Sequence, residues 1–579
     1  MSQTFDSAFG WRFSQRQEFW LLFGIALLVL GAGLGLRDPW PADEPRFALV
    51  AKQMIESGNW LIPHRGSELY PDKPPLFMAM QAFFYTLTGS WRIAFLLPSL
   101  LASLGMFALV YDLGRRLWDH RVGLYAAVAL LCTFQFVYQA KRAQIDPSVC
   151  FFLTLANYGL LRHFLLGPHW RAYWLGCFAA GLGVITKGVG VLALLMFVPY
   201  LFARWQGWSD VSRPAERGDA LRWLLGLFAF VVATALWLGP MLYAVHADGG
   251  PEYRAYMNDI LFRQTAERYT ESWHHHQPFW YYAEVIGSAW LPLALTLPWA
   301  VPRWRQALRQ RDARVLLLLG WIVLIILFFT FPKGKRDVYI MPALPLLALL
   351  VGSQLQFVTA QPWFRRVVLA FVSLLGVVFL LAGALAWSGH LSAANRLLEQ
   401  RGLEAGGAQL WLFVLSVGLV ACVSALWLRV RRSVLAMLLT LAAIWLGFGF
   451  WAYPVLNDST SAVQVMRKTG EMIGKDAELG LVAWKEQNLL HADRPAKDFG
   501  FLKPWPQQLA QAQQWQAQQP AQRWLFVLRD AFGACVDADK AQYVGHANRR
   551  EWYLLRADAF RRGCDPATAK GEDGDSNAE

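Results

Sequence analysis

Apolar runs long enough to cross a bilayer recur along most of this chain, and they constrain its fold more than any other feature. Residues 19–36, 221–245 and 315–331 approach or reach the roughly 20 residues that a membrane-spanning helix requires. Only 16% of the 579 residues are charged and 56% are hydrophobic, whereas a soluble protein of this size needs more charge to cover its surface. The sequence therefore predicts a polytopic α-helical membrane protein.

Hydropathy predicts about thirteen spans along the chain. They cover residues 19–36, 92–111, 122–140, 146–165, 172–186, 189–203, 222–245, 284–301, 315–331, 338–357, 367–387, 409–428 and 433–454. The first run has no small-x-small cleavage site before Arg37, so we expect a retained helix rather than a removed signal peptide.

Arginines gather in alternate linkers between these spans, for example in residues 303–314 and 429–432. The positive-inside rule makes that side cytoplasmic, and an odd number of spans then places the N-terminus inside and the C-terminus outside. The predicted location is a bacterial inner membrane with the C-terminal region in the periplasm. The formal charge of +13 fits this pattern, because basic residues between spans indicate topology and anionic lipid rather than nucleic acid.

The composition changes near residue 457, which predicts two domains. Residues 1–456 form the transmembrane domain, with periplasmic interfacial helices at about 43–75. Residues 457–579 are polar, and their short apolar patches at 479–484 and 524–528 are typical of strands in a small α/β or α+β domain outside the membrane. Cys535 and Cys564 could pair in an exported domain, but their spacing leaves this open.

Several basic residues violate the positive-inside pattern, and these are the most informative charges of the chain. The predicted topology places the following on the outer side: Arg46, Lys73, Lys141, Arg142, Lys187, Arg263, Arg268, Lys333, Lys335 and Arg336. Cations that recur near the membrane plane in five separate loops suit the phosphate of a lipid. The alternative for any single member is that it snorkels to headgroups or pairs locally.

The first outer loop predicts an amphipathic helix in the interface, because apolar residues recur at helical spacing from Phe47 to Met54. Asp43 is the predicted N-cap, and Arg46 lies three residues further on the same side. The alternative for Asp43 is capping alone. Downstream, the prolines around Asp72 and Lys73 predict a rigid turn that presents both side chains at the membrane surface, or a simple helix-entry turn.

Two further outer features are less specific. Asp146 either caps the fourth span or serves a site. His274, His275 and His276 invite a metal interpretation, but three adjacent histidines cannot all face one metal on a regular element. We therefore assign no metal ligand and no certain cofactor, although a divalent metal stays possible. The sequence contains no P-loop, dinucleotide-binding fingerprint or HExxH motif.

These motifs, in this order, resemble those of a known family. They are Asp43-Glu-x-Arg46, Ser57-Gly-Asn-Trp60, Tyr70-x-Asp-Lys73-Pro-Pro, the Asp146 segment, Thr186-Lys187-Gly, Arg268, Gln277-Pro-x-Trp-Tyr-Tyr and Lys335-x-x-x-Tyr339-Ile-x-Pro. The chain resembles, over nearly its whole length, the bacterial lipid A aminoarabinose transferase (ArnT-like) family. That family belongs to the GT-C glycosyltransferases, which use polyprenyl-phosphate sugars and include relatives of the protein O-mannosyltransferases.

The resemblance implies an inverting transfer from undecaprenyl phosphate to lipid A, lipopolysaccharide or a related acceptor at the periplasmic face. It makes residues 1–456 the catalytic domain. The implied catalytic carboxylates are Asp43 and Asp146. The implied donor-phosphate ligands are Arg46, Lys73, Arg268 and Tyr339, with Asp72, Lys187 and Lys335 as additional site residues.

The chain also departs from the family in two places. Family members can bind zinc through a Glu just before the motif Lys and a His in a later outer loop, and here those positions hold Asp72 and Arg263. An arginine cannot be that ligand. The segment Lys335-Arg-Asp-Val-Tyr also differs from the usual Lys-Leu-Pro-Thr-Tyr, which leaves the donor sugar open.

The chemistry of such a transfer agrees with the motifs, because a phosphate leaving group needs cations near the membrane surface. Asp43 is a general base if the acceptor is a hydroxyl, whereas with a phosphate acceptor it orients groups or stabilises positive charge at the sugar carbon. The alternatives are a protein or glycan O-glycosyltransferase of the mannosyltransferase type, and a transporter or flippase of an anionic lipid. The sugar, the acceptor and the oligomeric state stay open.

Overall fold

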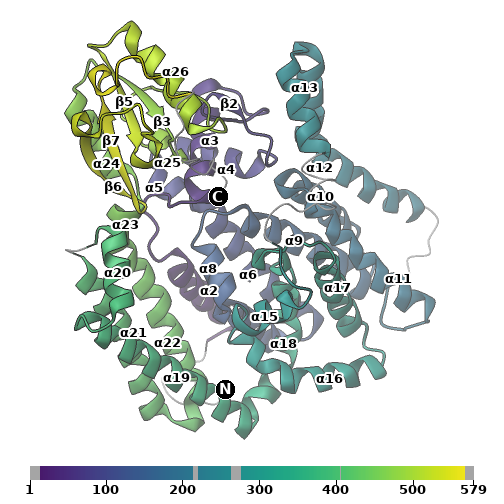
Figure 1. Cartoon of the computed structure of the whole chain (residues 1–579). Helices are drawn as coiled ribbons and strands as arrows, with labels where there is room; N and C mark the ends of the chain where they lie inside the picture. The colour runs from purple at the N-terminus through teal and green to yellow at the C-terminus, as the bar shows by residue number, and fades with distance from the viewer. Residues whose placement is uncertain (1–12, 213–218, 263–275, 404–405, 568–579) are drawn as a thin grey trace.

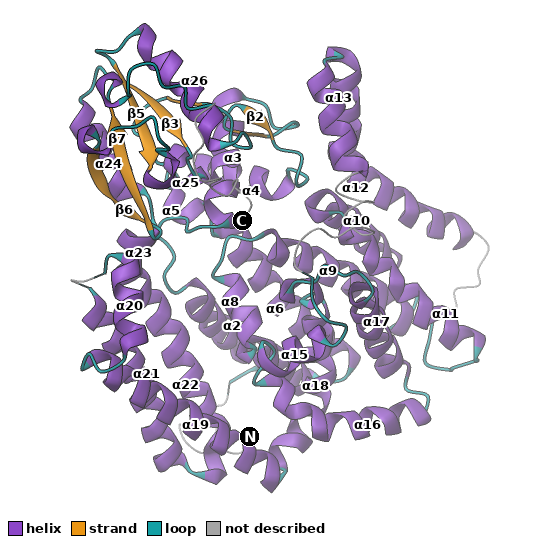
Figure 2. Cartoon of the chain, in the orientation of Figure 1, coloured by secondary structure: helices purple, strands orange, loops and turns teal. Residues whose placement is uncertain are grey.

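The computed structural model of the chain describes residues 13–212, 219–262, 276–403 and 406–567. These residues form a large assembly of helices, a two-stranded hairpin and a five-stranded β-sheet with its own helices (Figure 1). The strands gather at one end of the molecule, beside the early helices α3 and α4 (Figure 2). Segments from the two ends of the sequence therefore meet at this end.

The helical part contains the following α-helices and shorter helical turns. In chain order they are α2 (Gln15–Gly31), α3 (Asp43–Ser57), α4 (Leu76–Thr88), α5 (Trp91–Ala94), α6 (Leu97–Leu117), α7 (His120–Cys132), α8 (Phe134–Ala140), α9 (Ile145–Leu165), α10 (Trp170–Lys187), η1 (Val189–Met196), α11 (Phe197–Trp205), α12 (Asp219–Asp248), α13 (Pro251–Asn258), α15 (Tyr281–Ser288), η3 (Leu293–Thr296), α16 (Leu297–Arg309), α17 (Ala313–Thr330), η4 (Asp337–Ile340), α18 (Ala343–Ala360), α19 (Pro362–Trp387), α20 (Ser392–Arg401), α21 (Gly407–Leu428), η5 (Val430–Arg432), α22 (Ser433–Gly447), η6 (Phe448–Ala452) and α23 (Tyr453–Thr460).

Each of the predicted spans falls on helical structure, as the absence of water in a bilayer requires. Among the described residues, 7 helices are long and apolar enough to cross a membrane, and up to 9 if each bent pair is one span. The other predicted spans lie on α2, α9, α10 and the η1–α11 segment. In α9 most side chains are buried, including the polar Asn157 and His163, so this helix is covered by protein rather than by lipid.

The two bent pairs lie against each other. The pair α7 and α8 bends by 71°, and the helices on either side of the break after α15 bend by 94°. The first turn of α8 has backbone N–H groups without a partner inside the helix. Phe134 and Gln135 donate theirs to the carbonyl oxygens of Leu291 and Ala289, at 2.8 and 2.9 Å. Each break therefore supplies the hydrogen-bond partners of the other.

The second domain is built on a mixed five-stranded sheet of order β4-β3-β5-β7-β6. Its strands are β3 (Glu478–Val482), β4 (Ala496–Asp498), β5 (Arg523–Leu528), β6 (Gln542–Ala547) and β7 (Arg550–Leu555). β3 pairs in parallel with β4 and β5, whereas β7 pairs antiparallel with β5 and β6. Helices α24 (Val463–Ile473), α25 (Glu486–Leu490) and α26 (Trp505–Gln518) complete it. The apolar patches predicted as strands are β3 and β5, and Cys535 and Cys564 form a disulfide.

Helix α3 packs against this domain rather than lying open in a membrane interface. Its predicted apolar face is buried, and Phe47 and Met54 belong to the same hydrophobic core as Leu481 and Phe526 of the sheet. Phe47 also meets Phe77 of α4 edge-on, with ring centroids 5.4 Å apart. The amphipathic helix was thus predicted correctly, but its apolar face is covered by α4 and the C-terminal domain.

Candidate active site

Asp43 begins α3, but it does not cap this helix. The N-cap is Ala42, and no side chain there accepts a hydrogen bond from the first turn. The prediction that Asp43 is the N-cap is therefore wrong. Its carboxylate instead faces two other segments: Gln144 donates from Nε2 to Oδ2 at 3.4 Å, and Arg336 Nη2 lies 3.9 Å from the same oxygen.

Asp146 lies in the first turn of α9, where the N-cap is Gln144 without a side-chain capping bond. Capping by Asp146 is therefore excluded as well. Its carboxylate forms a short ion pair with Lys187, the last residue of α10. The Lys187 ammonium group lies 5.2 Å from the ring centroid of Tyr339.

These contacts form two side-chain groups, which the backbone joins into one cluster that we call the outer ring. Asp43 contacts Gln144 and Arg336 in the first group, and Lys187 contacts Asp146 and Tyr339 in the second. Gln144 and Asp146 stand at the start of α9. Arg336 precedes η4 and Tyr339 lies within it, where the Tyr339 amide donates to the Arg336 carbonyl at 3.1 Å. Four segments far apart in the sequence thus converge on one site.

Arg46 joins this ring to the C-terminal domain. Its Nη1 lies 3.6 Å from Asp43, and its Nε donates to Glu486 at 2.9 Å. Burial alone would lower the pKa of Arg46, but the charge and hydrogen bond of Glu486 and the charge of Asp43 help to raise it above the ordinary value. The guanidinium is therefore a fixed positive charge, and its side chain is still 21% exposed.

The remaining predicted site residues have mixed positions. Lys73 is half-buried and donates to the Asp72 carbonyl at 2.8 Å. Lys335 is buried and donates to the Gln277 carbonyl at 3.1 Å, so it anchors the segment that carries Arg336. Arg268 lies outside the described residues, as does Arg263.

A buried ion pair holds together the segments that carry the site, and we did not predict this pair from the sequence. The Arg37 guanidinium donates to Glu44 at 2.7 Å and to the Lys141 carbonyl at 2.9 Å. Glu44 also accepts from the Ala143 amide at 3.0 Å, so it fixes the chain just before α9. Although burial alone would raise the pKa of Glu44, the charge and hydrogen bonds of Arg37 hold it below the ordinary value. The signal in the sequence was a charged residue at the end of the first apolar run.

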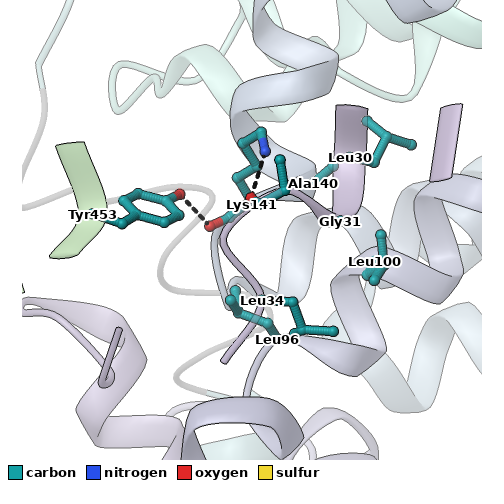
Figure 3. A pocket seen from close by; sticks show the side chains of 9 residues that line it. Leu30, Gly31, Leu34, Leu96, Leu100, Ala140, Lys141 and Tyr453 are labelled. Carbon is teal, nitrogen blue, oxygen red and sulfur yellow. Dashed lines mark hydrogen bonds between the residues drawn. The ribbon is translucent and has the colours of Figure 1, made fainter. Parts of the chain in front are cut away.

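Lys141 belongs to the network around the Arg37–Glu44 ion pair rather than to the outer ring. It lines a small pocket together with Tyr453 and apolar side chains of α2, α6 and α8 (Figure 3). Its ammonium group donates to the Ala32 carbonyl at 2.8 Å, and its own carbonyl accepts from the Tyr453 hydroxyl at 3.1 Å. Arg142 donates to the Tyr138 hydroxyl at 3.1 Å. For these two outer cations, the alternative of local pairing is the correct one.

The residues at the positions of the family's zinc ligands do not suit a metal, because one of them is an arginine. No group of three or more His, Cys, Asp or Glu side chains that could hold a metal occurs in the described part of the chain. Asp72 would have Arg263 as its partner by the family pattern, and a guanidinium is always protonated and has no lone pair to offer. His274 and His275 lie outside the described residues, whereas His276 forms a backbone bridge with Gly334.

Comparisons with known proteins agree with the motifs. The family model described as dolichyl-phosphate-mannose-protein mannosyltransferase matches residues 72–237. A protein of Pseudomonas aeruginosa PAO1 named undecaprenyl phosphate-alpha-4-amino-4-deoxy-L-arabinose arabinosyl transferase is 32% identical over 359 residues, which cover 59% of this chain and 60% of the relative. A protein of the same name from Enterobacter sp. strain 638 is 29% identical over 354 residues, with the same coverage. The matched region thus spans about 60% of the length of these relatives.

Solved structures extend the similarity over most of the chain. The crystal structure of ArnT from Cupriavidus metallidurans bound to undecaprenyl phosphate has a TM-score of 0.69 at 19% identity, covering 93% of this chain and 97% of that one. The same protein in the apo state gives 0.69 at 20% identity. The predicted fold class, a polytopic helical membrane protein with a small C-terminal α/β or α+β domain, is therefore confirmed.

Proposed function

We propose that this chain, a relative of the aminoarabinose transferases that shares their GT-C membrane fold, transfers a sugar from a polyprenyl-phosphate donor to lipid A or a related acceptor. The observation that carries the proposal is the outer ring, in which two carboxylates and three cations, counting Arg46 beside it, converge from separate segments. Such a set can bind an anionic leaving group and act on a sugar beside it.

The leaving group sets the first requirement. Transfer breaks the bond between the anomeric carbon and the phosphate oxygen, and negative charge then develops on the phosphate. Arg46 and Lys73 are the proposed ligands in the described part of the chain, and Arg268 is proposed from the sequence resemblance alone. Tyr339 lies against Lys187 and is a proposed hydrogen-bond donor at the same site.

Asp43 is the proposed catalytic carboxylate. Because it caps no helix, its charge is available to the reaction, and Gln144 and Arg336 hold its Oδ2 in one orientation. With a hydroxyl acceptor it would remove the proton, and with a lipid A phosphate it would stabilise positive charge at the sugar carbon. Asp146, paired with Lys187, is proposed as the second acidic residue of the site.

We propose specific candidates for the sugar and the acceptor. The relatives' names include 4-amino-4-deoxy-L-arabinose, so this sugar and lipid A are the first pair to test. The match of residues 72–237 to the protein mannosyltransferase model favours a hydroxyl acceptor as the second candidate.

We also propose that the site faces the periplasm, with residues 1–456 as the catalytic domain and residues 457–579 as a periplasmic domain. In the view of Figure 1, the sheet lies at the opposite end of the molecule from α16. Helix α16 contains the first part of the arginine-rich residues 303–314. The disulfide between Cys535 and Cys564 supports an oxidising compartment for the sheet domain. The positive-inside rule supports the same orientation.

The test is transfer by the purified protein in proteoliposomes. Labelled undecaprenyl-phosphate sugars, the aminoarabinose form included, are each offered with lipid A and with a hydroxyl acceptor such as a serine-containing peptide. We expect label to move to lipid A only when donor and protein are both present. A well-folded protein that moves none of these sugars to any acceptor would refute the proposal.

A further inference from the structure

Glu486 of the C-terminal domain reaches the proposed donor site. It begins α25, its side chain is only 6% exposed, and it lies between two guanidinium groups. Arg46 Nε is 2.9 Å and Arg65 Nη1 is 3.7 Å from the same carboxylate oxygen. A buried carboxylate is stable only when it is paired in this way.

A short hairpin docks onto the C-terminal domain beside Glu486. The hairpin consists of β1 (His64–Arg65) and β2 (Glu68–Leu69). Its Arg65 stacks over Phe501 at 4.0 Å, and Ser67 donates from N and Oγ to Asp498 at 3.0 and 2.7 Å. Gly66 packs so closely on Trp484 that an added Cβ would lie 2.9 Å from the indole ring.

Two anchors therefore define the plane of the Arg46 guanidinium. Glu486 takes Nε, and Asp43 of the outer ring lies beside Nη1. Arginine binds phosphate through a rigid planar fork of N–H groups, so the orientation of this plane decides which N–H groups face a donor.

We propose that Glu486 is a positioning residue that orients Arg46 toward the donor phosphate, so that the C-terminal domain contributes to donor recognition. This inference rests on the proposed function, because it takes Arg46 as a donor-phosphate ligand. It assigns the C-terminal domain a part in the reaction, whereas all the other residues proposed for the site belong to the transmembrane domain.

The sign of the effect separates this role from simple electrostatics. Glu486 offsets part of the positive charge of Arg46 and Arg65 at the junction of α3, the hairpin and the C-terminal domain. Removal of the Glu486 charge therefore leaves the junction more positive and would, by charge alone, strengthen binding of an anionic donor. A weaker use of the donor runs against this change in charge and is the effect expected from a misoriented Arg46.

The experiment is a double-mutant cycle of Glu486→Gln and Arg46→Gln, measured as kcat/KM for the undecaprenyl-phosphate donor at fixed acceptor. Charge-assisted hydrogen bonds are about twice as strong as neutral ones, so we expect Glu486→Gln to lower donor kcat/KM about tenfold. In the Arg46→Gln background the same change should have no further effect, because the residue it positions is gone. The acceptor KM should not move.

Asp498→Asn is the matched control, because it weakens the same docking contact through Ser67 without touching Arg46. We expect it to leave donor kcat/KM within twofold of wild type. Equal losses in Asp498→Asn and Glu486→Gln would overturn the inference, as would an unchanged or increased donor kcat/KM in Glu486→Gln. Glu486→Asp, which keeps the charge but withdraws the carboxylate, provides a second variant if Glu486→Gln does not fold, and it should also lower donor kcat/KM.

A separate measurement distinguishes failure of this inference from failure of the proposed function. Binding of undecaprenyl phosphate to the detergent-purified protein is followed by its thermal shift. If the wild type transfers sugar but the Glu486 and Arg46 effects add independently, the inference fails and the function stands. If the wild type neither transfers sugar nor binds undecaprenyl phosphate, the proposed function itself fails.

Discussion

Replacement of Asp43 by Asn tests whether the charge of this residue serves a reaction. The substitution keeps the size of the side chain and leaves an amide oxygen that can still accept from Gln144. It removes the negative charge, and with it any capacity to act as a base. Because Asp43 caps no helix, no backbone hydrogen bond of α3 is lost.

The structural cost of Asp43→Asn follows from its contacts. Its ion pairs with Arg46 and Arg336, at 3.6 and 3.9 Å, are partly exposed, and such pairs contribute about 0–1 kcal/mol. The interaction of a first-turn carboxylate with the helix dipole adds about 0.3–1 kcal/mol. We therefore expect a loss of at most about 3 kcal/mol in the free energy of unfolding. The catalytic loss should be far larger, since removal of a general base lowers the rate by about 10²–10⁴.

The assay compares transfer of labelled sugar from undecaprenyl phosphate with the thermal unfolding midpoint of the same preparation. Asp458→Asn is the control, because this aspartate is exposed and lies outside the outer ring. We expect Asp458→Asn to match wild type in both measurements. Asp43→Asn should stay folded, with a midpoint lowered by no more than a loss of about 3 kcal/mol implies, and should lose nearly all transfer. Near-normal turnover of a folded Asp43→Asn protein would refute the assignment and direct attention to Asp146.

Four further perturbations follow from the structure. Glu44→Ala leaves the Arg37 charge buried and unpaired, so we expect a loss of about 3–5 kcal/mol in the free energy of unfolding, measured by chemical denaturation, and unchanged stability would contradict the ion pair. Lys73→Ala and Arg268→Ala should each weaken donor use by the about 1.5–3 kcal/mol typical of a charge-assisted contact, and unchanged donor kinetics in the folded double variant would exclude both. Single cysteines placed in residues 457–567 should react with impermeant reagent added to intact spheroplasts, whereas protection there would reverse the topology. Burial lowers the pKa of His491 from its ordinary 6.5 to about 4, so the unfolded chain takes up a proton at a higher pH than the folded protein does. The free energy of unfolding should therefore fall by about 2 kcal/mol by pH 5. His491→Phe should remove that part of the pH dependence, measured by chemical denaturation.

The sequence by itself determined the class of fold and the order of its helices. Apolar runs such as 315–331 can exist in a bilayer only as helices, because no water is present to satisfy their backbone groups. The patches at 479–484 and 524–528 likewise became β3 and β5 of the sheet. The motifs around Asp43, Asp146 and Tyr339 indicated residues that the structure brings together in the outer ring.

The tertiary structure decided what each of these side chains contacts. Local spacing made Asp43 and Asp146 equally good helix caps, yet Ala42 and Gln144 occupy those positions, because the chain direction before each helix is set by distant packing. The Arg46–Glu486 hydrogen bond joins residues 440 positions apart, and no periodicity in the sequence reports a contact over that distance. The number of charged groups near the membrane surface could be predicted from the sequence. Which of them face one another depends on how α3, α9, α10 and the C-terminal domain pack, and only that packing distinguishes a supporting ion pair such as Arg37–Glu44 from a site residue.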